Sequence, residues 1–317
     1  MDRTLPLIAL VGPTAVGKTA LSLTLAEELN AEIISVDSMQ VYKYMDIGTA
    51  KPSRQEQGRV QHHLIDVVYP DEEYHAGRFV KEAKQAITTI RGRGKQPLLV
   101  GGTGLYLKSL LDGIFEMPAI KKEVRKEIQL RLAEKGSAAM HGLLAEADPV
   151  MAAKIHPHDS QRISRGLEIF ESTGVRWSDL LRKQQQEKKS LPCCLIGLTR
   201  SRTELYERIN LRSSLMLENG LIEEGQKLLD MGYSATLKSM QSLGYRHVAA
   251  MLAGKRDFAE TLACLARDTR HYAKRQYTWF TAMHGLKWFD CKDEAGIRAY
   301  LRAFLAKEKA GNNRSDL

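Results

Sequence analysis

The sequence has no long apolar run, no cysteine pair of the CxxC type and no large excess of either charge. No stretch of its 317 residues approaches the ~20 consecutive apolar residues that cross a bilayer, so we expect no membrane partner. The apolar segment 5–11 is too short for a secretory signal and runs directly into a glycine motif. The four cysteines lack the spacing of a metal site, and we expect reduced thiols in a cytoplasmic protein.

The balance of charge is modestly positive. The chain has 47 Lys and Arg against 38 Asp and Glu, a formal net charge of +9. This total by itself does not identify a nucleic-acid-binding protein. A hydrophobic fraction of 43% is enough to bury a core, which excludes a generic disordered chain. A chain of this length is expected to form two domains, or one large domain with an insertion.

Strand signals alternate with helical periodicity in the first third of the chain, which is the pattern of an α/β fold with a parallel sheet. Residues 115–190 carry almost no strand signal and predict an all-helical insertion. From residue 202 onward the chain is again mainly helical. The expected strands are 7–11, 32–36, 63–67, 97–100, 194–198 and 286–289, with early helices over 18–29 and 75–92.

The most specific local pattern is a glycine-rich loop between the first expected strand and the first helix. It is a complete GxxxxGK[ST] motif, whose amides curl around an anion while the helix N-terminus adds partial positive charge. We expect Lys18 to contact phosphate oxygens and the hydroxyl of Thr19 to bind Mg²⁺. The expected phosphate-binding residues are Gly12, Pro13, Thr14, Ala15, Val16, Gly17, Lys18 and Thr19.

This loop predicts a P-loop NTPase-like parallel sheet flanked by helices, with an all-helical insertion domain. We expect residues 1–114 and 191–317 to form the catalytic core with its C-terminal helices, and residues 115–190 to form the insertion. The loop does not identify the phosphate compound, because any diphosphate satisfies the same amides. The strand ending at Val100 is followed by Gly101-Gly-Thr-Gly104 and not by an acidic residue, which weakens the ATPase interpretation.

Two polar residues follow strands at the sheet edge where ligands bind in open α/β folds. Asp37 follows the second strand, where a carboxylate can hold Mg²⁺, act as a general base or cap a helix. Thr103 follows the fourth expected strand, where it contacts a ligand or belongs to a tight turn.

A third feature is a basic helix face at residues 267–275, followed by aromatic residues. Phosphate backbones favour such a face, and Tyr277 or Trp279 would stack on a base. The alternative is a solvated helix face.

Taken in order, these segments resemble the tRNA dimethylallyltransferase (tRNA isopentenyltransferase) family of the bacterial type. The resemblance extends from about residue 5 to residue 290. The eukaryotic Cys/His zinc-finger extension is absent. The segments that carry the resemblance are 12–19, 37–42 (DSMQVY), 45–52 (MDIGTAKP), 62–66 (HHLID), 101–106 (GGTGLY), 159–165 (DSQRISR), 244–246 (GYR) and 269–280.

The resemblance implies transfer of a dimethylallyl group from dimethylallyl diphosphate to N6 of adenosine-37 in tRNAs that read codons beginning with U, with release of pyrophosphate. It implies that Asp37 is the base, that Lys18, Arg212 and Mg²⁺ act on the diphosphate, and that Thr103 contacts substrate. Two alternatives remain open: an ATP-dependent small-molecule kinase and a non-catalytic RNA-binding protein.

The resemblance also implies contacts with the anticodon stem-loop of tRNA, made in part by the helical insertion, and we expect a monomer. The family commonly has an arginine where this chain has Thr281. The expected tRNA contacts are Asp37, Ser38, Met39, Gln40, Thr103, Arg125, Gln161, Arg162, Ile163, Ser164, Arg165, Gly244, Tyr245, Arg246, His247, Arg275, Gln276, Tyr277, Thr278, Trp279, Phe280 and Thr281.

Overall fold

The computed structural model describes residues 5–113, 120–186 and 191–312, which fall into two compact units. One unit consists of the residues up to Leu111 and from Leu191 onward, and the other lies between Asp112 and Ser190. The expected boundaries of the insertion, at 115 and 190, lie outside the described residues. None of the helices in the described ranges is long and apolar enough to span a bilayer.

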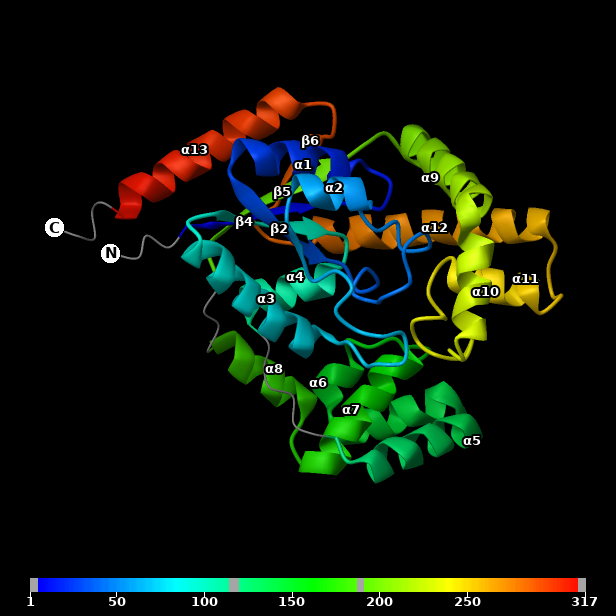
Figure 1. Ribbon diagram of the computed structural model, residues 1–317. Helices are drawn as coiled ribbons and strands as arrows, with labels where there is room; N and C mark the ends of the chain where they lie inside the picture. The colour runs from blue at the N-terminus through cyan, green and yellow to red at the C-terminus, as the bar shows by residue number, and fades with distance from the viewer. Residues whose placement is uncertain (1–4, 114–119, 187–190, 313–317) are drawn as a thin grey trace. The chain divides into compact units, whose positions relative to one another are not determined.

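The larger unit contains a six-stranded sheet with the order β3-β2-β4-β1-β5-β6, in which every neighbouring pair is parallel (Figure 1). Each residue of β1 is buried, as expected for a continuous apolar run in a parallel sheet covered on both faces. Five of the six expected strands are confirmed to within one residue at each end. The strands are β1 (Leu7–Val11), β2 (Ala31–Val36), β3 (His62–His63), β4 (Gln96–Gly101), β5 (Cys193–Thr199) and β6 (Lys287–Asp290).

The expected strand at residues 63–67 is wrong over most of its length. β3 has only two residues, because Leu64 and Asp66 adopt positive φ angles of 62° and 56° and turn the chain away from β2. The backbone then bonds to a different segment: Asp66 N donates to Gln40 O at 3.2 Å, and Val67 N donates to Val41 O at 2.8 Å. This segment therefore runs beside residues 40–42 without forming a strand, with Leu64 buried and Ile65 and Val67 half-buried.

Helices cover both faces of the sheet, with α1 and α13 on one face and α3 and α4 on the other (Figure 1). The two early helices are confirmed, each shorter by one residue than expected. The helices of this unit are α1 (Lys18–Glu28), α2 (Arg54–Arg59), α3 (Ala76–Gly92), α4 (Gly104–Asp112), α9 (Arg202–Met216), the π-helical turn η1 (Leu217–Leu221), α10 (Ile222–Asp230), α11 (Tyr245–Leu252), α12 (Phe258–Thr281) and α13 (Glu294–Asn312).

The described residues of the second unit form helices joined by short loops, with no strand among them. Its core is formed by apolar side chains that α5 and α7 bury against each other, including Ile128, Leu144 and Ile163. Gly136 has a φ of 76° and kinks α5 in its middle. The helices are α5 (Lys122–Ala147), α6 (Pro149–Ala152), α7 (Ser160–Thr173) and α8 (Trp177–Gln186).

The parallel sheet brings several chain reversals to one edge, because all carboxyl ends of its strands lie on the same side. Gly12 follows β1, Asp37 follows β2, and Arg200 follows β5. β2 and β4 approach closely here: a Cβ atom on Gly101 would lie 2.1 Å from the carbonyl oxygen of Val36. Glycine at this position therefore allows the two strand ends to stay side by side.

Replacing Gly101 by alanine should destabilise the larger unit by ~1–3 kcal/mol, because the methyl group overlaps backbone atoms that cannot move independently. Chemical denaturation monitored by circular dichroism measures this change. The matched variant is Gly58→Ala in α2, where no heavy atom lies within 4 Å of the added Cβ. Equal stability of the two variants would contradict the close packing of β2 and β4.

Candidate active site

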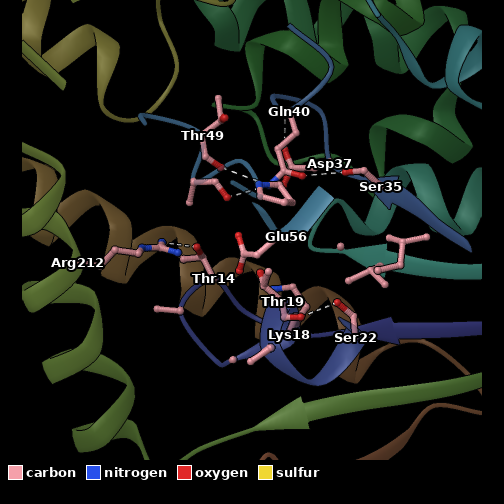
Figure 2. A pocket seen from close by; sticks show the side chains of 18 of the residues that line it. Thr14, Lys18, Thr19, Ser22, Ser35, Asp37, Gln40, Thr49, Glu56 and Arg212 are labelled. Carbon is pink, nitrogen blue, oxygen red and sulfur yellow. Dashed lines mark hydrogen bonds between the residues drawn. The ribbon is translucent and has the colours of Figure 1, made fainter. Parts of the chain in front are cut away.

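A cavity of about 450 Å³ opens at the carboxyl edge of the sheet, between the phosphate loop, the segment after β2 and helix α9 (Figure 2). Its lining is polar on the side of the loop and apolar where α9 contributes Leu211 and Leu215. The lining residues are Thr14, Ala15, Gly17, Lys18, Thr19, Ala20, Ser22, Ile33, Ser35, Asp37, Gln40, Thr49, Ala50, Pro52, Glu56, His62, Val100, Gly101, Arg208, Leu211, Arg212 and Leu215.

The phosphate loop has the strained backbone expected of an anion-binding turn. Gly12 and Gly17 have φ angles of 148° and 114°, and Ala15 also has a positive φ of 66°. An alanine in this conformation costs about 1 kcal/mol or more and needs support from its surroundings. Two arginines supply that support: Arg208 Nε donates to Ala15 O at 2.9 Å, and Arg200 Nε donates to Val16 O at 2.8 Å.

Lys18 is folded back over the loop, where Nζ donates to Gly12 O and Pro13 O, both at 2.9 Å. The pKa of Lys18 is lowered to about 8, chiefly by burial; the charge of Asp37 partly opposes this shift, and the charge of Arg212 adds to it. The ammonium group is thus a poorly solvated cation, and a bound anion would stabilise its charged form.

Thr14 is held from two sides. Its hydroxyl accepts a hydrogen bond from Arg212 Nη2, and its amide donates to Gln276 Oε1 at 2.8 Å. The amide of Thr14, one of the expected phosphate-binding residues, is thus hydrogen-bonded to a side-chain amide in this structure. Gln276 also donates to Gly102 O at 3.0 Å and so connects the phosphate loop with the turn after β4.

Arg212 lies on α9 and points toward the phosphate loop (Figure 2). Burial lowers its pKa to about 10, and the charge of Arg208 one turn away contributes, while Asp37 opposes the shift. Lys18, Arg208 and Arg212 thus surround one small cavity with positive charge. This concentration is suited to an anion of high charge, such as a diphosphate.

The helix-cap alternative for Asp37 is wrong, because no helix follows β2 before α2 begins at Arg54. Its Oδ1 accepts from Met39 N at 2.8 Å and Gln40 N at 3.3 Å, which is the geometry of an Asx turn. The carboxylate nevertheless lines the cavity and is half-buried. Ser38 N donates to the Thr103 hydroxyl at 3.0 Å, so the segments after β2 and β4 meet beside Asp37. The structure therefore brings Lys18, Asp37, Thr103 and Arg212 to one sheet edge.

The cavity offers oxygen ligands of the kind that hard divalent cations prefer. The hydroxyl of Thr19 stands in the first turn of α1, and Asp37 and Glu56 also line the cavity. Among the described residues, no group of three or more His, Cys, Asp or Glu side chains is arranged to hold a metal by itself. The donor set therefore fits an ion that shares its coordination sphere with phosphate oxygens and water.

On α12, the expected tRNA contacts divide between buried and exposed side chains. Gln276 and Phe280 are buried, whereas Arg275 is exposed. The hydroxyls of Thr278 and Thr281 donate to carbonyls of α12 itself, at Lys274 and Tyr277.

The motif at 101–104 interlocks with α12. A Cβ atom on Gly102 would lie 2.2 Å from Nε2 of Gln276, and one on Gly104 would lie 2.0 Å from the indole of Trp279. The ring of Tyr277 packs on Trp288 with centroids 4.9 Å apart. Tyr277 and Trp279 still expose 44% and 39% of their surfaces, which leaves part of each ring open to solvent.

On α11, only one of the expected tRNA contacts has an exposed side chain. Tyr245 and His247 are buried, and Gly244 has a φ of 91° that starts the helix. Arg246 is 41% exposed and donates to Asp268 Oδ2 at 2.7 Å. Tyr245 and His247 were expected to contact RNA, but neither has an exposed side chain that could do so in this structure.

In the helical unit, the three arginines among the expected contacts each pair with an acidic side chain. Arg125 on α5 and Arg165 on α7 both face Glu168, at 3.9 Å and 3.3 Å. Arg162 is 62% exposed and pairs with Asp159, the N-cap of α7. Gln161 is exposed beside it.

The remaining two expected contacts of that unit face inward. Ile163 belongs to the core, and Ser164 is buried with its hydroxyl unbonded among the described residues.

Three site residues were missed or given another role from the sequence. Arg208 stands one helical turn before Arg212, so its spacing was a usable signal. Arg200 directly follows β5, where the sheet-edge rule would have indicated it. Gln276 was expected to contact RNA, and no sequence signal connects it with a loop 262 residues earlier.

Family comparisons match most of the chain. The family described as IPP transferase matches residues 40–283, and the one described as isopentenyl transferase matches residues 5–67. Among curated relatives, a tRNA dimethylallyltransferase of Desulfotalea psychrophila is 51% identical over 292 residues, covering 92% of this chain and 93% of that protein. One from Thermotoga petrophila is 45% identical over 303 residues, covering 95% and 98%.

Solved structures agree with these relatives. The tRNA isopentenylpyrophosphate transferase of Bacillus halodurans is 39% identical with a TM-score of 0.72, covering 97% of this chain and 99% of that one. A eukaryotic dimethylallyltransferase described as acting on tRNA is 29% identical with a TM-score of 0.79, covering 97% and 80%. The predicted P-loop-like parallel sheet with its helical insertion is confirmed.

The lowered pKa of Lys18 predicts that pyrophosphate binding weakens as pH rises through about 8, because the lysine loses the charge that attracts the anion. Between pH 7 and pH 9 the charged fraction falls roughly tenfold, and affinity should fall by a similar factor. Isothermal titration calorimetry with inorganic pyrophosphate measures this dependence. Lys18→Met is the control, since it retains only the titration of pyrophosphate itself. Parallel pH profiles in the two proteins would contradict the role of Lys18.

Proposed function

This chain belongs to the IPP transferase family of tRNA dimethylallyltransferases, and we propose from its site how it acts. It is an enzyme that transfers a dimethylallyl group to tRNA. We propose that the donor is dimethylallyl diphosphate, the acceptor is N6 of adenosine-37 in tRNAs reading codons that begin with U, and the product is pyrophosphate. A cytoplasmic monomer is the expected form.

The observation that supports this proposal most is the composition of one cavity. The phosphate loop and the cations Lys18 and Arg212 line it together with the carboxylate of Asp37. The cations suit the leaving diphosphate, and the carboxylate suits an acceptor that must lose a proton. Because both groups line the same 450 Å³ space, donor and acceptor can meet there.

The proposed chemistry follows from the charges that develop as the prenyl group leaves the diphosphate. Cleavage of the allylic C–O bond places positive charge on carbon and negative charge on the departing pyrophosphate, which Lys18 and Arg212 stabilise. The N6–C bond forms as the C–O bond breaks, and the proton on N6 passes to Asp37. The hydrogen bonds that the amides of Met39 and Gln40 donate hold Oδ1 of Asp37 in place for this step.

A divalent cation fits the same edge of the site. We propose Mg²⁺, held by the Thr19 hydroxyl together with diphosphate oxygens and water. When bound, such an ion supplies positive charge that neutralises the leaving group.

The two other functions considered from the sequence are not favoured. A small-molecule kinase and a non-catalytic RNA-binding protein both differ from the relatives and solved neighbours, which are transferases named for tRNA.

For tRNA binding, we propose that exposed cations on each unit contact the anticodon stem-loop. Arg275 and Arg246 present charge on the larger unit, and Arg162, Arg165 and Arg125 do so on the helical unit. The adenosine must leave the loop stack to reach Asp37, as in other enzymes that modify a base. The buried residues among the expected contacts would support these surfaces without touching RNA through their side chains.

Asp37→Asn should reduce kcat by ~10²–10⁴-fold, because asparagine can keep the hydrogen bonds from the amides of Met39 and Gln40 but cannot accept the proton. Mass spectrometry of nucleosides from tRNA incubated with dimethylallyl diphosphate and Mg²⁺ measures product. The affinity for tRNA should change little. Asp257→Asn, at the N-cap of α12, tests the same substitution at a carboxylate outside the cavity that also accepts a backbone amide, and it should retain activity. Near-normal turnover of Asp37→Asn would exclude Asp37 as the base.

Arg162→Ala and Arg275→Ala should each weaken tRNA binding and reduce the salt dependence of log Kd by about one. Filter binding at several salt concentrations measures both quantities. Arg302→Ala on α13, an exposed arginine outside the expected contacts, is the matched control. An unchanged salt slope in the first two variants would remove these arginines from the tRNA surface.

A further inference from the structure

The segment 45–52 belongs to the family resemblance, yet no side chain in it has an assigned role. The structure shows that a carboxylate from α10 holds its backbone. Glu224 accepts from the amides of Asp46 at 2.9 Å, Ile47 at 2.9 and 3.1 Å, and Gly48 at 3.1 Å. Three consecutive amides thus converge on one carboxylate, an arrangement that fixes a loop far more firmly than a single hydrogen bond.

Tyr245 completes this anchor. Its hydroxyl donates to Glu224 Oε1 at 2.5 Å, and its ring packs against the loop so closely that a Cβ on Gly48 would lie 2.4 Å from Cε2. The side chain of Tyr245 is fully buried in the core that α10, α11 and the segment after β2 share. The glycine of the loop and the tyrosine of the 244–246 motif therefore form one packing unit.

Lys51 holds the other end of the loop. Its Nζ donates to Asp46 Oδ1 at 2.5 Å, to Asp66 Oδ1 at 2.6 Å and to Tyr42 O at 2.9 Å. The side chain is only 3% exposed. With both ends bonded, the carbonyl groups between them have little freedom to move.

Those carbonyl groups determine the position of Gln40. Its Nε2 donates to Ala50 O at 3.2 Å and to Thr49 O at 3.5 Å, and its Oε1 accepts from Ser35 at 2.9 Å (Figure 2). Gln40 lines the cavity, and its backbone amide donates to the carboxylate of Asp37. The anchored loop is therefore connected to the expected base through a single residue.

We propose that Glu224 and Tyr245 are positioning residues for prenyl transfer: they anchor the loop at 46–50, which holds Gln40 beside Asp37 in the wall of the cavity. This inference rests on the proposed function, since it assigns a role to residues around its base. It also gives Tyr245 a role in place of an RNA contact. Neither residue touches substrate, and both act through Gln40.

Steady-state kinetics of a double-mutant cycle tests this connection. Glu224→Gln should lower kcat at least tenfold, because its amide nitrogen would face the loop amides, and Tyr245→Phe should lower it severalfold. The Kd for tRNA should stay within twofold of the wild type. In a Gln40→Ala background, Glu224→Gln and Tyr245→Phe should lower kcat little further, since the side chain that they position is already absent. Tyr245→Phe retains the ring that packs against Gly48, so it can test the proposal even if Glu224→Gln does not fold.

Tyr74→Phe is the matched control. It removes another tyrosine hydroxyl bonded to a glutamate, the 2.7 Å bond from Tyr74 to Glu82, and should leave kcat unchanged. Fully additive losses in the Gln40→Ala background would overturn the proposal, as would a large loss of tRNA affinity in Tyr245→Phe. Absence of prenyl transfer by the wild-type protein would instead refute the proposed function, so the two failures are distinguishable.

Discussion

The arrangement of the site depends on holding several positive charges around a small cavity. Burial is the main cost there, as the lowered pKa values of Lys18 and Arg212 indicate, and repulsion among Lys18, Arg208 and Arg212 adds to it. The nearby charge of Asp37 offsets part of this cost, and two loop carbonyls accept hydrogen bonds from the Lys18 ammonium group. The diphosphate that we propose as donor would offset the remaining repulsion, so these charges would favour binding of the leaving group.

Holding the charges in place requires a rigid surround, which close packing between distant motifs supplies. Gly102 and Gly104 make room for Gln276 and Trp279, and Gly48 makes room for Tyr245. In each case a glycine near the sheet edge receives a large side chain from a C-terminal helix. The motifs of α11 and α12 therefore support the cavity wall, in addition to presenting arginines at the surface.

Much of the fold was predictable because its signals are local. The apolar run of β1, the glycine motif and the periodicity of α1 and α3 each depend on neighbours in the sequence. The expected strand at 63–67 failed because the positive φ angles of Leu64 and Asp66 depend on partners elsewhere in the fold, including Lys51 for Asp66. An apolar segment indicates burial without showing whether the chain is extended.

The sequence by itself determined the phosphate loop, the sheet-edge position of Asp37 and the family, because each is encoded in contiguous residues with a defined chemistry. Only the tertiary structure decided which residues surround them. Gln276 accepts a hydrogen bond from the phosphate loop, and Glu224 accepts hydrogen bonds from the segment after β2. Arg208 donates to the carbonyl of Ala15. These roles arise from contacts across more than 170 residues, where packing and hydrogen bonding select partners that no local pattern specifies.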